Sequence, residues 1–97
     1  MININKIVDG KDCTIQISGR LDTTTAPQLD AFIVENISGA STLTLDCEGL
    51  TYVSSAGLRV LLATHKRMKG ALTLKNVCEL VMEVFEITGF ADVLTIE

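Results

Sequence analysis

The stretch TYVSSAGLRVLL, residues 51–62, passes from a β-branched and aromatic run into helical spacing within three residues. The run TYV is typical of a strand end, and the leucines and valine after it recur at helical spacing over more than one face. Two serines and a glycine lie at the junction. The stretch therefore predicts a strand, a tight turn and a well-buried helix from about Ala56 to Met68.

Working outward, short alternating runs predict further strands. They are ININKI (2–7), CTIQISG (13–19), STLTLDCEG (41–49), GALTLKN (70–76) and DVLTIE (92–97). The polar DGKD, residues 9–12, predicts a hairpin turn between the first two strands. The first two strands are therefore expected to form an antiparallel pair at an edge of the sheet.

Two more segments have helical periodicity. One follows Thr25, a candidate cap, and ends near Gly39; the other is expected to start with a capping box of Asn76 and Glu79 and to end at Gly89. The expected order is β-β-α-β-α-β-α-β. This order predicts an α/β fold with a mixed four- to five-stranded sheet and helices packed mainly on one face. Residues 1–97 are expected to form a single domain.

Composition argues against several classes of function. The net charge of −4 and the absence of an extended basic face exclude nucleic acid as an expected partner. Three scattered cysteines and one histidine, with no CxxC pair, make a metal site unexpected, and no cofactor motif is present. No apolar run approaches the ~20 residues that span a bilayer. We therefore expect a cytoplasmic protein with free thiols and no direct membrane insertion.

The serines at the junction do not form a catalytic site with any base in the sequence. A nucleophilic serine needs a general base within hydrogen-bond reach. The only histidine, His65, lies ten residues after Ser55, which is roughly 15 Å along a continuous helix. The motifs GxSxG, SxxK, HExxH and GxxxxGK are all absent. No catalytic residue is predicted, and the chain is not expected to be an enzyme.

Two interpretations of the junction remain open on residue chemistry alone. A serine at Ser54 or Ser55 can cap the helix by accepting a hydrogen bond from a first-turn amide, an effect of about 1 kcal/mol. A glycine at Gly57 costs about 1 kcal/mol in helix propensity, so it needs a reason. Either it leaves the backbone bare for close approach by another molecule, or it allows tight packing of the helix on the sheet.

Three segments together resemble the STAS domain, and more narrowly the bacterial anti-sigma factor antagonists. They are GRLDTTTAPQL (19–29), LDCEGLTYVSSAGLRVLL (45–62) and ITGFADVLTI (87–96). The resemblance covers nearly the whole chain. It implies a partner-switching module, in which the unmodified antagonist docks on an anti-sigma factor that has serine kinase activity and so frees a sigma factor. It also implies that phosphorylation releases the antagonist and that a PP2C-type serine phosphatase resets it.

The same resemblance implies the site residues. In the family pattern D-S-x-G-L, Ser55 matches the phosphorylated serine and Ser54 stands in place of the Asp, so Ser54 is a second possible acceptor. Asp22 matches another acidic family position, although it can equally be a turn residue that caps the next helix. Arg59 lies one helical turn after Ser55. The predicted docking surface consists of Arg20, Asp22, Thr23, Thr24, Ser54, Ser55, Ala56, Gly57 and Arg59.

A second function is compatible with the resemblance. The domain could be a non-phosphorylated STAS subunit of an ABC transporter for membrane lipids or small molecules, where it would brace the ATPase. Phosphorylation at Ser55 by a kinase would separate the two functions.

Overall fold

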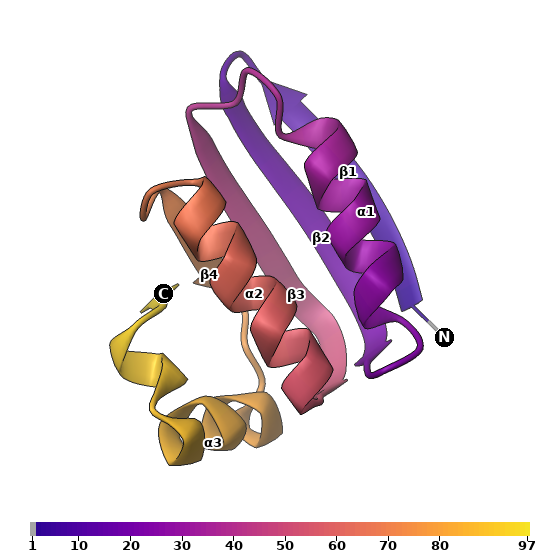
Figure 1. The fold of residues 1–97 in the computed structure, drawn as a ribbon, viewed down its shortest axis with the longest axis vertical. Helices are drawn as coiled ribbons and strands as arrows, with labels where there is room; N and C mark the ends of the chain where they lie inside the picture. Colours follow the sequence, from indigo (N-terminus) through magenta and orange to yellow (C-terminus); the bar gives the residue numbers. More distant parts are fainter. Residues whose placement is uncertain (1) are drawn as a thin grey trace.

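The computed structural model describes residues 2–97 and contains one five-stranded sheet in the order β1-β2-β3-β4-β5 (Figure 1). The strands are β1 Ile2–Asp9, β2 Asp12–Leu21, β3 Thr42–Val53, β4 Leu72–Lys75 and β5 Thr95–Ile96. The helices are α1 Ala26–Asn36, α2 Ser55–Arg67, α3 Glu79–Thr88 and the short 3-10 helix η1 Phe90–Asp92. β1 pairs antiparallel with β2, and the other pairs are parallel. The predicted fold class and element order are confirmed.

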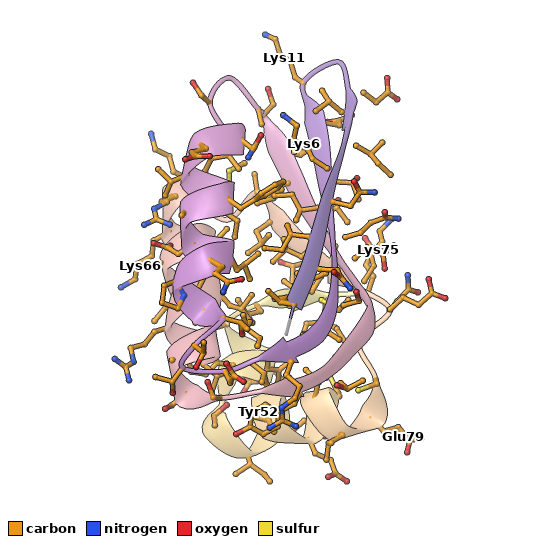
Figure 2. All side chains as sticks on the ribbon, turned by 90° about the vertical axis from the view of Figure 1, so that its right-hand side faces the viewer. Lys6, Lys11, Tyr52, Lys66, Lys75 and Glu79 are labelled. Atoms are coloured by element: carbon orange, nitrogen blue, oxygen red, sulfur yellow. The ribbon has the colours of Figure 1, made fainter. Side chains whose placement is uncertain are left out.

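Alternation along the strands directs one row of side chains toward the helices. In β2, Ile15 and Ile17 are buried while Gln16 between them is partly exposed, as the pattern predicts. Helices α1 and α2 lie side by side on one face of the sheet (Figure 1). Seen edge-on, α1 lies on that face, and α3 lies across the end of the sheet (Figure 2). The core therefore lies in a single layer between the sheet and its helices.

Strand β3 is longer than the sequence indicated. It runs for 12 residues, through Gly49 and on into Tyr52 and Val53. The pairing of β2 with β3 shifts register twice, between Gln16 and Ser18 and again at Gly19. A side chain at Gly49 would collide with Ser18, so this glycine permits close approach of two strands and does not end a strand.

The predicted capping box of α3 is wrong. The helix begins at Glu79 after Cys78, and Cys78 makes no side-chain cap hydrogen bond. Asn76 instead has a positive φ of 59°, and its amide donates to Asp46 Oδ1 at 2.9 Å. Asn76 therefore forms a turn and ties β4 to β3. At the other end, Gly89 ends α3 in the left-handed conformation, as predicted.

Candidate functional site

The β2–α1 and β3–α2 connections meet at one edge of the sheet. β2 and β3 are parallel and Leu21 lies opposite Val53, so both strands end at the same edge. The Ser54 N–H donates to the Leu21 carbonyl at 2.8 Å and ties the two turns together. Figure 1 shows that α1 and α2 both begin at this edge. The structure thus brings together the two loops in which the docking surface was predicted.

The two serines of the β3–α2 turn have different surroundings. Ser54 is the N-cap residue of α2, and its Oγ accepts from the Gly57 N–H at 3.3 Å. Ser55 is the first residue of the helix and is exposed. Its side chain makes no hydrogen bond with residues 2–97. The cap is therefore Ser54, and the hydroxyl of Ser55 is available at the positive end of the α2 dipole.

Gly57 does not leave an open backbone at the surface. It is buried, and a Cβ placed there would lie 2.7 Å from Leu21 Cγ and 2.9 Å from Val53 Cγ2. The first turn of α2 thus packs directly on the ends of β2 and β3. Of the two explanations for this glycine, tight packing is the one the structure supports, and the place of Gly57 in the docking surface stays a prediction.

Asp22 organises the β2–α1 turn. Its Oδ1 accepts from the backbone N–H groups of Thr24 and Thr25, both at 3.0 Å. These bonds hold the pKa of Asp22 below its usual value of 3.8, and the bond from the Thr25 N–H has the largest effect. Partial desolvation of the carboxylate acts in the opposite direction and raises the pKa. The Asp22 carbonyl also accepts from the Ala26 N–H at 2.8 Å. Asp22 therefore has the capping role that was one of its two interpretations.

Thr25 does not cap α1 with its side chain, contrary to the prediction. It is buried, and its Oγ1 donates to the Arg20 carbonyl at 2.6 Å and accepts from the Asp22 N–H at 2.8 Å. The Thr25 hydroxyl therefore bonds within the turn that precedes α1, and the Asp22 carboxylate accepts from the last two N–H groups of that turn. Thr23 and Thr24, in contrast, are exposed at the tip of the turn.

The arginines of the docking surface are exposed. Arg20 lies over the ring of Tyr52, with its guanidinium carbon 4.1 Å from the ring centroid, and Arg59 projects from α2. Ala56 is half-buried. Tyr52 was not among the residues predicted for the docking surface. Its pairing with Arg20 across β2 and β3 would have indicated that it lies there. That pairing depends on two register shifts, which the sequence did not predict.

The described residues contain no arrangement for covalent chemistry at this edge. His65 lies near the far end of α2 from Ser55, and its buried Nδ1 has no hydrogen-bond partner in residues 2–97. Burial raises the pKa of the Cys47 thiol to about 12, so this thiol stays protonated. Within residues 2–97, no group of three His, Cys, Asp or Glu could hold a metal ion. No helix in that range is long and apolar enough to cross a bilayer.

A family model described as "Mlab, STAS domain" matches residues 6–95, and the chain therefore belongs to the STAS domain family. The anti-sigma-B factor antagonist of Bacillus subtilis is 31% identical over 98 residues, covering 98% of this chain and 90% of the relative. Anti-sigma factor antagonists are regulatory binding proteins, which agrees with the prediction that the chain is not an enzyme.

Solved structures show the same fold at lower identity. An anti-sigma factor antagonist from Mycobacterium paratuberculosis has a TM-score of 0.89 at 19% identity, over 99% of this chain and 85% of that one. The Bacillus cell fate determinant SpoIIAA in its phosphorylated form has a TM-score of 0.72 at 20% identity, over 100% and 91%. These likenesses establish the fold of this chain.

Proposed function

We propose that the chain is an anti-sigma factor antagonist whose docking is controlled by phosphorylation of Ser55. One observation carries the choice of serine. The Ser54 hydroxyl is engaged as the helix cap, whereas the Ser55 hydroxyl is exposed and makes no bond within residues 2–97. A kinase can therefore reach Ser55 without uncapping α2. The name of the Bacillus subtilis relative supports the partner, an anti-sigma factor.

Phosphate on Ser55 would act at the contact surface and leave the fold intact. It adds roughly −1.5 to −2 charges and three acceptor oxygens. At the start of α2 these oxygens meet free amides and the positive end of the dipole, so the modified domain stays folded. A partner packed on the hydroxyl must now desolvate a dianion. Each ~1.4 kcal/mol of that cost weakens affinity tenfold.

The proposed cycle has two partners, both acting in the cytoplasm. The unmodified chain sequesters an anti-sigma factor with serine kinase activity, which frees the sigma factor. Phosphorylation by that kinase releases the chain, and a PP2C-type phosphatase restores the Ser55 hydroxyl.

Mapping the phosphate tests the proposal. The chain is incubated with ATP and an anti-sigma factor with serine kinase activity from the same organism, and modified peptides are identified by mass spectrometry. We expect phosphate on Ser55 in the wild type and in Ser54→Ala, and none in Ser55→Ala. Ser54→Ala is the matched control because it removes the neighbouring hydroxyl alone. Phosphate on Ser54, or none on any serine, would contradict the proposal.

Binding of the same kinase tests the switch. We expect Ser55→Asp and the phosphorylated chain to bind at least about tenfold more weakly than the wild type, as measured by titration calorimetry. Ser55→Ala should bind as the wild type does. Unchanged affinity for both modified forms would exclude electrostatic release at Ser55.

A second candidate is a STAS subunit of a membrane lipid or small-molecule transporter. The departure at Ser54 from the D-S-x-G-L pattern favours it, because the acidic residue expected beside a phosphorylated serine is missing. In that case co-purification would recover a transporter ATPase, and the kinase would leave Ser55 unmodified. The phosphate map therefore separates the two functions.

A further inference from the structure

Arg20 and Tyr52 form an ordered pair at the edge of the sheet where the two turns meet. They lie opposite each other near the ends of β2 and β3, and the guanidinium carbon is 4.1 Å from the ring centroid. Arg20 is exposed and Tyr52 is half-buried, so the ring is held by the protein while the guanidinium faces solvent. Such a cation–π contact restricts the arginine side chain before any ligand binds.

The guanidinium of Arg20 makes no ion pair or hydrogen bond within residues 2–97. Asp22, two residues along, binds backbone N–H groups through its Oδ1 and forms no ion pair with Arg20. Arg67 shows the contrast: it is similarly solvent-facing, but its Nη1 lies 2.8 Å from Asp30 Oδ1. The N–H donors of Arg20 are thus ordered by stacking and still available in the plane of the guanidinium.

The charged groups beside this pair are mainly positive, whereas the whole chain has a negative net charge. The net charge is −4, yet the docking surface exposes two arginines, Arg20 and Arg59, and its one carboxylate is engaged with backbone amides. The acidic helix α3 packs against β3, and its first residue, Glu79, points to the other side of this end of the molecule from Tyr52 (Figure 2). Complementary charge favours an acidic surface on the partner.

We propose that a carboxylate of the protein partner, an Asp or Glu side chain, binds the stacked guanidinium of Arg20. The inference rests on the proposed function and adds the chemistry of the partner: the surface that meets this edge is acidic. It also adds to the switch where the acidic surface of the partner extends from Arg20 to the start of α2, at the end of the sheet where Ser55 lies. Repulsion would then add to the cost of desolvating the dianion.

Binding of the same kinase to charge and stacking variants tests the inference. We expect Arg20→Gln to weaken binding by about tenfold or more, and Arg20→Lys by severalfold, since lysine keeps the charge but lacks the planar fork. Tyr52→Phe should bind like the wild type and Tyr52→Leu severalfold more weakly. The matched control is Lys66→Gln, which removes one exposed positive charge away from Tyr52 and should change affinity less than twofold (Figure 2).

Salt dependence and oligomeric state complete the test. Raising the salt concentration should weaken wild-type binding more than binding of Arg20→Gln, because the lost contact is ionic. Equal affinity of the kinase for the wild type and for Arg20→Gln would overturn the inference about Arg20 and leave the proposed function standing. Kinase that does not bind the wild type would overturn the proposed function as well. If the chain self-associates, and Arg20→Gln abolishes the self-association without changing kinase binding, the Arg20–Tyr52 pair forms a contact between copies. That result would also overturn the inference.

Discussion

The two turns that leave β2 and β3 end at the same edge but use their polar groups differently. In the β2–α1 turn the carboxylate of Asp22 accepts from two backbone amides, and the hydroxyl of Thr25 bonds inside the turn. In the β3–α2 turn Ser54 makes one longer bond of 3.3 Å, and Ser55 makes none within residues 2–97. One turn is therefore held by its own side chains, and the other keeps a hydroxyl available for modification.

The largest stability effect is expected where the β3–α2 turn packs on the sheet. Gly57→Val places methyl groups where even a Cβ comes within 3 Å of Leu21 and Val53. Overpacking of this kind costs about 1–3 kcal/mol, and valine regains little helix propensity. Urea unfolding should show that loss, whereas Arg59→Val, at an exposed position on the same helix, should cost less than about 1 kcal/mol. Equal losses would mean that Gly57 is not closely packed.

A smaller loss is expected when the β2–α1 turn loses its carboxylate. Asp22→Ala removes the acceptor for the N–H groups of Thr24 and Thr25 and should lower the Tm by a few degrees at pH 7. Thr23→Ala, at an exposed position of the same turn, should leave the Tm unchanged. Unfolding followed by circular dichroism measures both.

The pH dependence of that loss identifies the charge as its source. The pKa of Asp22 is lower in the folded chain than its usual 3.8, so the ionised carboxylate stabilises the fold above that pH. This contribution disappears as the pH falls through the lowered, folded-state pKa. Wild type and Asp22→Asn should therefore differ in Tm at pH 7, begin to converge below pH 3.8, and meet once the pH has fallen below the lowered folded-state pKa. A constant difference down to strongly acidic pH would instead indicate a change in turn geometry.

The cap of α2 should contribute less. Ser54→Ala removes one long hydrogen bond and should destabilise by about 0.5–1 kcal/mol. Ser54→Asp should be at least as stable as the wild type, because a negative charge at the start of a helix contributes about 0.3–1 kcal/mol. If Ser54→Asp also speeds phosphorylation of Ser55, kinase recognition depends on the acidic residue that this chain lacks.

The smallest effect is expected at the acceptor itself. Ser55→Ala should change the free energy of unfolding by less than about 0.5 kcal/mol, since the side chain is exposed and bonds to nothing in residues 2–97. Chemical denaturation would measure this, with Ser54→Ala as the comparison. A larger loss at Ser55 than at Ser54 would reverse the roles assigned to the two serines.

Local patterns in the sequence predicted most of the fold. Alternation placed Ile15 and Ile17 on the buried face of β2, and helical spacing placed α1, α2 and α3 close to their observed bounds. The order of elements then implied parallel crossovers and a mixed sheet. These features depend on residues near each other in the chain, which is why periodicity detects them.

Features set by contacts between distant residues were missed. Gly49 resembled the end of a strand because its close neighbour, Ser18, lies on another strand. Asn76 resembled a helix cap, but its amide bonds to Asp46, thirty residues earlier. At the site, the sequence suggested the two turns but not which serine caps α2, why Gly57 is a glycine, or that Tyr52 lies beneath Arg20. The last two depend on the register of β2 against β3, and the first depends on where α2 begins.

The position of Tyr52 makes the docking edge directly visible to spectroscopy. It is the only tyrosine, and the chain has no tryptophan, so its phenol ring is the only fluorophore when excitation lies beyond the absorption band of the three phenylalanines. The ring lies under Arg20 at the edge where α1 and α2 begin. The intensity of the tyrosine emission and its quenching by iodide therefore report changes in the surroundings of Tyr52, and no added label is needed. Protein partners that contain neither tryptophan nor tyrosine can be titrated by following the Tyr52 emission alone.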